Sequence, residues 1–209
     1  MKGLIINMIK TIIFDIGNVL AHFRWEDYIN DAGYTDDIKE KVSKATVLSP
    51  RWDELDRGAR DEKDIIAECV SAEPEAEKEI LQLFNDSSQL VKEYAYSSKL
   101  LRTLKDNGYK VYLLSNYPRF SFKYAKENFG FFNYIDGMVV SYMVKTIKPE
   151  PEIYQILIDK YNINPEETVF LDDRIVNIDG AKPFRLNTIL VESYDQMISE
   201  LTKLGVEVE

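Results

Sequence analysis

Residues 12–20 constrain the fold of this 209-residue chain more than any other segment. They read Ile-Ile-Phe-Asp-Ile-Gly-Asn-Val-Leu, so a run of β-branched and aromatic residues leads directly into a carboxylate and a glycine turn. Such a run, without a period of 3.6 residues, is typical of a buried strand, which we expect over Ile9–Phe14. Asp15 then stands at the carboxyl end of this strand, as a candidate nucleophile or metal ligand.

Further polar residues follow other strand-like or extended segments, at Ser115-Asn116, Lys148 and Asp172-Asp173. In a parallel α/β sheet the carboxyl ends of the strands lie side by side at one edge, where residues far apart in the sequence converge. We therefore expect these side chains to gather around Asp15.

Strand-like and helix-like segments alternate from about residue 95 to the end of the chain, which predicts an α/β fold with a parallel sheet covered by helices on both faces. Residues 23–94 are charged, helical in period and without a convincing strand, so they predict an inserted helical cap. The expected division is a core of residues 1–22 and 95–209 and a cap of residues 23–94. The expected helices are Trp25–Ile29, Asp36–Val47, Asp61–Val70, Pro74–Phe84, Leu90–Asp106, Arg119–Asn128, Pro151–Tyr161, Ile175–Ala181 and Ser193–Leu204.

Composition excludes several classes of function. The formal net charge of −10 argues against a nucleic-acid partner, because a phosphate backbone attracts basic surfaces. Cys69 is the only cysteine, so an internal disulfide and a multi-thiolate zinc site are excluded. His22 is the only histidine, which excludes a metal site with two histidines.

No stretch of about 18 apolar residues is present, so we expect no membrane span. Met1–Asn7 is too short in its apolar part to be a secretory signal, and Met8 could be an alternative start. The expected location is cytoplasmic. The sequence does not indicate an oligomeric state.

The polar strand ends suit attack on a phosphate monoester. The ester is already anionic, so a catalyst must place positive charge and hydrogen-bond donors around its oxygens. Asp15 would be the nucleophile that forms an acyl phosphate, which water later hydrolyses. Lys148 would neutralise both Asp15 and the phosphoryl group, while Ser115 and Asn116 would hold phosphoryl oxygens.

The order Asp15, Ser115-Asn116, Lys148, Asp172-Asp173 resembles the haloacid dehalogenase superfamily of phosphatases and dehalogenases, over nearly the whole chain. The phrase Phe-Asp-Ile-Gly-Asn-Val-Leu is similar to a subgroup with bacterial glucose-1-phosphatases and the phosphatase-like domain of epoxide hydrolases. The resemblance implies a Rossmann-like core with a cap that selects a small phosphorylated metabolite.

The resemblance also implies a Mg²⁺ site. Magnesium prefers oxygen ligands and takes one or two carboxylates together with substrate phosphate. Asp15, Asp173 and the main-chain carbonyl of Gly17 would be direct ligands, and Asp172 would act through water. Asn177, one helical turn beyond Asp173, could orient a carboxylate.

Gly17 is a departure from the family pattern. Most phosphatases of the superfamily carry an aspartate two residues after the nucleophile, which protonates the leaving group and later activates water. Glycine can do neither, and His22 is one candidate substitute. The gap leaves two alternatives open, a 2-haloacid dehalogenase and a catalytically idle module that binds a phosphorylated ligand.

Overall fold

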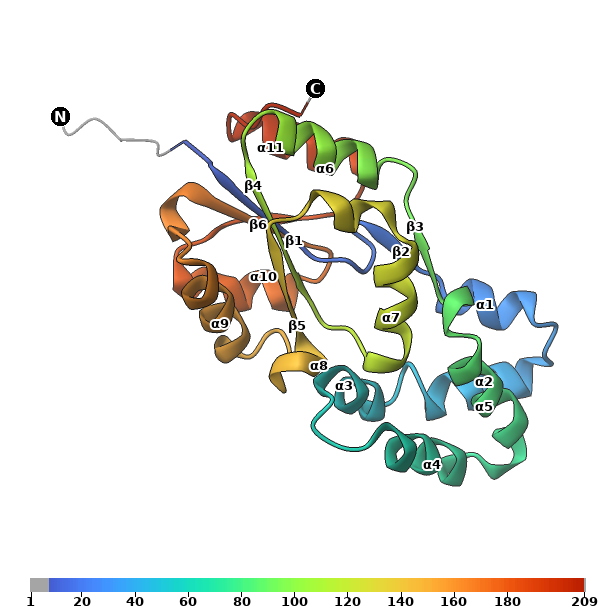
Figure 1. Ribbon diagram of the computed structural model, residues 1–209. Helices are drawn as coiled ribbons and strands as arrows, with labels where there is room; N and C mark the ends of the chain where they lie inside the picture. The colour runs from blue at the N-terminus through green and yellow to red at the C-terminus, as the bar shows by residue number, and fades with distance from the viewer. Residues whose placement is uncertain (1–7, 209) are drawn as a thin grey trace.

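A five-stranded parallel sheet forms the centre of the molecule, in the strand order β5-β4-β1-β6-β7 (Figure 1). The structure is a computed structural model that describes residues 8–208. The strands are β1 (Thr11–Phe14), β4 (Lys110–Ser115), β5 (Gly137–Val140), β6 (Thr168–Asp172) and β7 (Asn187–Leu190). In the central strand, Ile12 pairs with Val111 on one side and with Val169 on the other.

Helices cover both faces of this sheet (Figure 1). They are α6 (Ser97–Asp106), α7 (Arg119–Asn128), α8 (Ser141–Val144), α9 (Pro151–Tyr161), α10 (Ile175–Ala181) and α11 (Tyr194–Lys203), with 3-10 turns at Gly130–Tyr134, Pro165–Glu167 and Lys182–Phe184. Successive strand residues point to opposite faces. Ile12 and Phe14 therefore pack in one hydrophobic cluster with Leu101, whereas Ile13 packs in a second with Tyr154. The predicted α/β class, with a parallel sheet covered on both faces, is confirmed.

The insertion after β1 forms a helical unit with a hydrophobic cluster of its own, which includes Tyr28, Val42, Leu55, Ile65 and Leu83. Its elements are α1 (Trp25–Asp31), α2 (Asp36–Ala45), α3 (Pro50–Arg57), α4 (Glu62–Ala72) and α5 (Glu77–Asn85), with 3-10 turns at Pro74–Ala76 and Ser87–Gln89. We call the segment from α1 to α5 the cap.

A short antiparallel ribbon of β2 (Ala21–Phe23) and β3 (Val91–Glu93) joins the cap to the core. The prediction of a helix beginning at Leu90 is wrong, because α6 begins only at Ser97. Residues 91–93 instead gain backbone hydrogen bonds from pairing with β2. A three-residue strand carries too little pattern to be recognised from its own sequence.

Helix α3 was also not predicted. It begins after Ser49, whose side chain accepts a hydrogen bond from the amide of Arg51, and its first residue is proline. Both are helix start signals. The helix is only 8 residues long and has just two buried residues, Leu55 and Asp56, so its apolar face is nearly invisible in the sequence.

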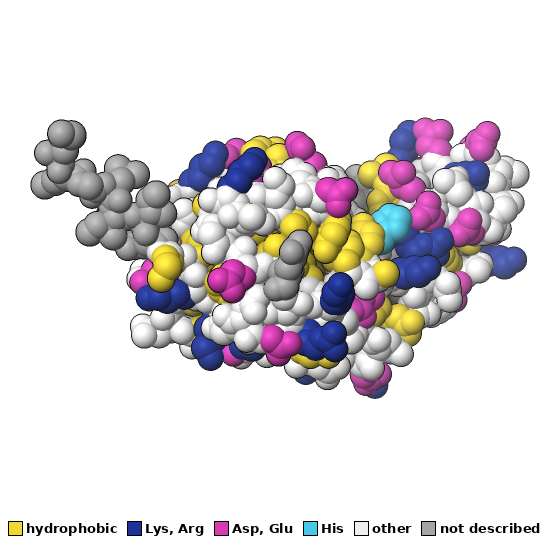
Figure 2. All heavy atoms as spheres, turned by 90° about the horizontal axis from the view of Figure 1, so that it is seen from above, with side chains coloured by type: hydrophobic (Ala, Val, Ile, Leu, Met, Phe, Trp, Pro, Cys, Tyr) yellow, Lys and Arg dark blue, Asp and Glu magenta, His cyan; other side chains and the backbone are white. Residues whose placement is uncertain are grey.

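Charges on the face seen in Figure 2 are mixed, with acidic and basic side chains interspersed over the surface. None of the helices within residues 8–208 has the length and apolar character needed to cross a membrane. The interpretation of Met1–Asn7 falls outside the described residues.

Candidate active site

Asp15 leaves the sheet at the carboxyl end of β1, where the chain turns away from the buried strand. The residue is only 7% exposed, and one carboxylate oxygen, Oδ1, accepts a hydrogen bond of 2.7 Å from the amide of Ile16. Burial raises the pKa of Asp15 to about 7, an effect that Lys148 opposes and that the nearby carboxylates of Asp172 and Asp173 reinforce.

Lys148 is fully buried between two carboxylates. Its Nζ lies 3.0 Å from Oδ1 of Asp15 and 2.6 Å from Oδ2 of Asp172. Burial alone would lower the pKa of Lys148, but the two carboxylates outweigh that effect and raise the pKa above its ordinary value. The lysine therefore keeps its positive charge beside the candidate nucleophile.

Asn116 is bound to the main chain of Lys148. Its Nδ2 donates to the carbonyl oxygen of Lys148 at 2.9 Å, and its Oδ1 accepts from the amide of Lys148 at 2.7 Å. The side chain thus positions Lys148 and also lines the cavity described below. Ser115 is buried beside Asp15, where its hydroxyl lowers the pKa of that carboxyl. That Ser115 and Asn116 contact a phosphoryl group stays a prediction.

Asp172 is fully buried and has several hydrogen-bond donors. Its Oδ2 accepts from Lys148, and its Oδ1 accepts from the amide of Arg174 at 2.8 Å. The Nδ2 of Asn177 lies 3.0 and 3.1 Å from the two carboxylate oxygens. Asn177 therefore orients a carboxylate, as its spacing in the sequence suggested.

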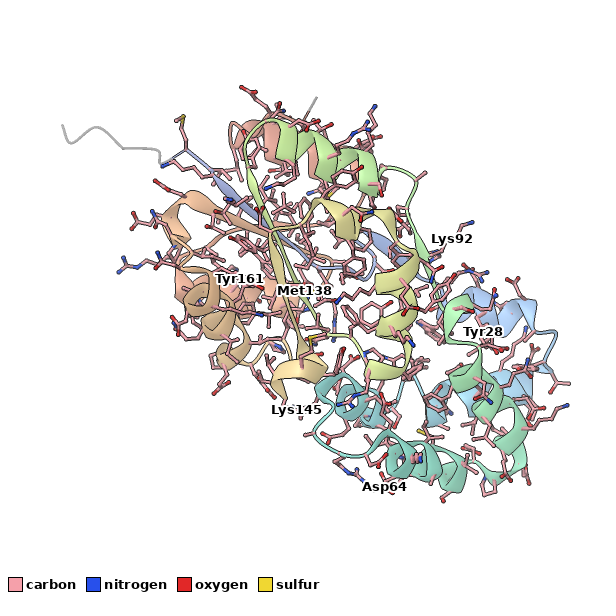
Figure 3. The ribbon with its side chains drawn as sticks, in the orientation of Figure 1. Tyr28, Asp64, Lys92, Met138, Lys145 and Tyr161 are labelled. Carbon is pink, nitrogen blue, oxygen red and sulfur yellow. The ribbon has the colours of Figure 1, made fainter. Side chains whose placement is uncertain are left out.

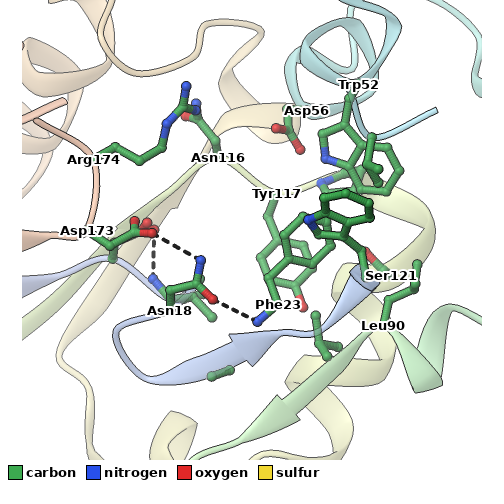
Figure 4. A pocket seen from close by; sticks show the side chains of 18 of the residues that line it. Asn18, Phe23, Trp52, Asp56, Leu90, Asn116, Tyr117, Ser121, Asp173 and Arg174 are labelled. Carbon is green, nitrogen blue, oxygen red and sulfur yellow. Dashed lines mark hydrogen bonds between the residues drawn. The ribbon is translucent and has the colours of Figure 1, made fainter. Parts of the chain in front are cut away.

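Asp173 is only half-buried and faces the cavity. Its Oδ2 accepts a hydrogen bond of 3.0 Å from Nδ2 of Asn18, and Oδ1 of Asn18 accepts from the amide of Phe23 (Figure 4). Asn18 thus ties the turn after β1 to the acidic pair. Its φ of 52° is left-handed, which asparagine tolerates better than most residues.

The carboxylates at this sheet edge could hold a metal ion. One oxygen from each of Asp15, Asp172 and Asp173 lies within 4.8 Å of the other two. Oδ1 of Asn177 is buried there without a hydrogen-bond partner among the described residues. An all-oxygen donor set suits a hard cation such as Mg²⁺, so the residues present fit the ion that the sequence predicts. Gly17 lines the same cavity through its main chain.

A cavity of about 440 Å³ lies between the sheet edge and the cap (Figure 4). Its floor contains Asp15, Lys148 and Asp173. Its other walls are largely apolar and include Phe23, Trp25, Leu48, Trp52 and Leu90. The volume is that of a pocket for a small organic molecule.

Asp56 on α3 is the buried carboxyl that the cap contributes to this cavity, and sequence reasoning did not select it. It lies four residues after Trp52, which also lines the cavity, so the two share one helix face. That spacing is the signal that could have found it. Its Oδ1 is buried without a hydrogen-bond partner in the part of the chain that the structure describes.

Three contacts hold the end of α3 against the core. Arg57 donates to both oxygens of Glu150, at 2.7 and 2.6 Å. The hydroxyl of Ser141 donates to the carbonyl of Asp56 at 2.5 Å, and Lys145, labelled beside α8 in Figure 3, donates to the carbonyl of Gly58. We call these contacts the latch.

His22 does not line the cavity. It lies in β2, its ring stacks on Tyr94, and its Nδ1 is 3.8 Å from a carboxylate oxygen of Asp27. The suggestion that His22 replaces the missing acid is therefore wrong for this conformation. Cys69 is buried in the cap cluster.

Comparison with known proteins agrees with this geometry. A family model described as haloacid dehalogenase-like hydrolase matches residues 9–185. A sesquiterpene phosphatase of Aspergillus oryzae is 27% identical over 83% of this chain and 85% of its own length. A D-ribitol-5-phosphate phosphatase of Bacteroides thetaiotaomicron is 28% identical over 93% of this chain and 98% of its own length.

A solved structure gives the same fold. It is a HAD family enzyme of Bacteroides thetaiotaomicron in complex with magnesium and inorganic phosphate, and it superposes with a TM-score of 0.69 at 24% identity. The match covers 90% of this chain and 98% of that one.

Proposed function

The chain belongs to the haloacid dehalogenase-like hydrolase family, and on that premise we propose that it is a Mg²⁺-dependent phosphatase of small phosphate monoesters. The observation that carries the proposal is the buried Lys148 bridging Asp15 and Asp172, next to Asp173 at the floor of the cavity between sheet edge and cap. The division proposed with it is a core of residues 1–22 and 95–209 and a cap of residues 23–94.

Asp15 is the proposed nucleophile. An oxygen of its carboxylate attacks phosphorus, the bond from phosphorus to the organic alcohol breaks, and an aspartyl-phosphate forms. Water then attacks phosphorus, releasing phosphate and restoring Asp15. Lys148 keeps its charge beside the attacking carboxylate and offsets the negative charge brought by the phosphoryl group.

Asp15, Asp173 and the carbonyl of Gly17 would hold Mg²⁺, and Asp172 would act through water. The bound ion would supply positive charge against the phosphoryl oxygens. Burial and repulsion between neighbouring carboxylates raise the pKa values of Asp15 and Asp173. A bound cation would offset this repulsion and favour the ionised carboxylates.

The apolar cap wall suggests where the organic part of the substrate lies. Trp52 packs against Phe23, with a distance of 5.6 Å between the ring centroids, beside the cavity. Such a wall accommodates an apolar group such as a sesquiterpene, the class named for one relative, and an aromatic face can also stack on a sugar ring. Sugar phosphates and isoprenoid phosphates are therefore both proposed classes.

A panel of phosphorylated metabolites that includes both classes tests the function. Release of inorganic phosphate is measured with Mg²⁺ and with a chelator, for the wild type and for Asp15→Asn. We expect turnover that requires Mg²⁺ and that falls on the order of 10⁴-fold or more in the variant, as for the loss of other enzyme nucleophiles. Full activity of Asp15→Asn would exclude it as the nucleophile.

The same proteins separate the two alternatives. A 2-haloacid dehalogenase would release halide from 2-chloropropionate without Mg²⁺, because its carboxylate attacks carbon. An idle module would bind inorganic phosphate in calorimetry yet turn over no member of the panel.

A further inference from the structure

The organic alcohol leaves phosphorus as a basic alkoxide unless a proton reaches it, so the cavity needs an acid above the attacking carboxylate. Gly17, two residues after Asp15, has no side chain that could donate a proton. Lys148 is bound by two carboxylates that raise its pKa, so it holds its proton. Asp173 must be ionised to bind a cation.

Three other residues that line the cavity are also unsuited. Arg174 does not lose a proton in proteins. Tyr117 lines the cavity with a buried hydroxyl that has no hydrogen-bond partner among the described residues. Burial raises the pKa of this hydroxyl well above the ordinary tyrosine value, and the nearby carboxylates of Asp56 and Asp15 add to the effect. Asp53 lies on α3 as well, but its side chain is exposed to solvent.

Asp56 differs from all of these groups. The residue is only 7% exposed, its Oδ1 has no hydrogen-bond partner within residues 8–208, and it enters the cavity from the cap, across from the sheet edge. Figure 4 shows it between Asn116 and Trp52. The latch fixes its main chain, since Ser141 donates to its carbonyl and Arg57, the next residue, pairs with Glu150.

Resting on the phosphatase function proposed above, we infer that Asp56 is the general acid and base of the reaction. Its carboxyl proton passes to the leaving oxygen as the bond to phosphorus breaks, so the alcohol departs neutral. In the second step its carboxylate takes a proton from the attacking water, the bond between phosphorus and Asp15 breaks, and Asp56 ends protonated again.

The charge state of Asp56 agrees with this role. Burial raises its pKa well above the ordinary value, and the carboxylates of Asp53 and Asp15 add to this effect. Lys148 and Arg174 act in the opposite direction. The side chain is therefore protonated at a higher pH than an exposed aspartate, as an acid for this step must be.

Two esters distinguish an acid from a structural residue. p-Nitrophenolate leaves without help, whereas the alkoxide of β-glycerol phosphate needs a proton. We expect Asp56→Asn to lower kcat/KM for β-glycerol phosphate by about 10²–10⁴-fold and for p-nitrophenyl phosphate by about threefold or less, since general acid catalysis contributes to the first alone. Asp56→Glu, which keeps a carboxyl group, should recover part of the loss.

The second step gives an independent readout. With p-nitrophenyl phosphate, Asp56→Asn should form the aspartyl-phosphate at a normal rate and hydrolyse it slowly, so the intact mass of the protein should show the covalent adduct. Asp64→Asn is the matched control, because Asp64 is exposed on the outer side of α4 (Figure 3). It should behave as the wild type.

The outcomes separate this inference from the function on which it rests. An equal loss for both esters, or no loss for either, would overturn the role of Asp56 while wild-type turnover still supported the phosphatase. A wild type inert toward both esters and the metabolite panel with Mg²⁺ would overturn both.

Discussion

At the sheet edge, Lys148 pairs with both Asp15 and Asp172, and Asn177 also donates to Asp172. Across the same cavity, the carboxyl group of Asp56 lies on the cap with one buried oxygen that has no hydrogen-bond partner among the described residues. At the sheet edge Lys148 opposes the effect of burial on the pKa of Asp15, whereas Asp56 has no ion pair within residues 8–208, and burial raises its pKa well above the ordinary value. One small cavity can therefore hold a nucleophile and a proton donor made from the same residue type.

The largest effect should come from removing Lys148, which pairs with the carboxylates of the sheet edge. Lys148→Met leaves two buried carboxylates without their counter-charge, and breaking a buried ion pair typically costs about 3–5 kcal/mol. We expect urea denaturation to show a stability loss of that order, and activity to fall by at least about 10³-fold.

Lys123→Met is the control, because Lys123 is exposed and lies 3.9 Å from its only ion-pair partner in the described chain, Glu127. Unchanged stability of Lys148→Met would mean that the carboxylates do not need the lysine.

Moving the proton-donating carboxyl group from the cap to the sheet edge should test whether either region can supply the acid. A Cβ at Gly17 would meet nothing within 4 Å, so a side chain fits there. In an Asp56→Asn background, Gly17→Asp should restore about tenfold or more of the turnover of β-glycerol phosphate, part of the about 10²–10⁴-fold that an acid contributes.

Gly17→Asn in the same background tests whether the carboxyl group is responsible. It adds a side chain of the same size that cannot donate an acidic proton. Equal recovery of turnover by Gly17→Asp and Gly17→Asn would contradict the idea that a carboxyl group at residue 17 replaces that of Asp56.

Weakening the latch should have a smaller effect. Glu150→Gln removes the charge that pairs with Arg57 but keeps its shape. Because partly exposed ion pairs contribute about 0.2–1 kcal/mol, we expect kcat/KM to fall by about 1.5- to 5-fold, with a weaker dependence on salt than in the wild type.

The control for this change is Glu200→Gln, which breaks a surface pair with Lys203 on α11. A loss as large as that of Asp56→Asn would show that the latch does more than position the cap.

The pH dependence of stability should give the smallest effect. Folding raises the pKa of Asp56, so above its ordinary value of 3.8 the folded protein retains a proton that the unfolded chain has released. Stability therefore falls as pH rises from about 4 toward the folded pKa. Asp56→Asn lacks this loss, so its Tm should rise relative to the wild type as the pH increases from about 4 toward the folded pKa of Asp56, by about 2–4 °C per kcal/mol.

Scanning calorimetry across that range measures the difference in Tm between Asp56→Asn and the wild type. Both proteins contain Asp15, so the effect of its titration is the same in both and does not contribute to the difference. Asp64→Asn should show a constant difference from the wild type. A constant difference for Asp56→Asn as well would mean that its pKa is not raised by folding.

Much of the fold could be predicted because its core elements are long and strongly patterned. The helices Arg119–Asn128, Pro151–Tyr161 and Ile175–Ala181 have the expected bounds. The ribbon could not be predicted, since β2 and β3 gain their structure from pairing with each other. Helix α3 was missed because so little of its surface is apolar.

The residues of the site also divide into those that the sequence indicates and those that it does not. The convergence of Asp15 with Asp172 and Asp173 could be predicted because strand ends in a parallel sheet lie at one edge, whereas Lys148 lies in the loop between α8 and α9 and does not follow a strand directly. Asn18 was not selected, although asparagine after a glycine is typical of a turn. Asp56 could not be placed from local sequence, since its position in the cavity that Asp15 also lines depends on how the cap docks on the core.

The ribbon of β2 and β3 also has a consequence for how such a chain can diversify. Ala21 lies opposite Glu93, and Phe23 lies opposite Val91, so the two crossings between core and insertion are hydrogen-bonded neighbours. Paired antiparallel residues lie about 5 Å apart. The core therefore meets everything from residue 24 to residue 90 as a single closed loop. Any helical module whose ends come that close, and that brings a carboxyl group of its own in place of Asp56, could replace it without disturbing the sheet. New substrate preferences could then evolve while the carboxylates of the sheet edge stay in place.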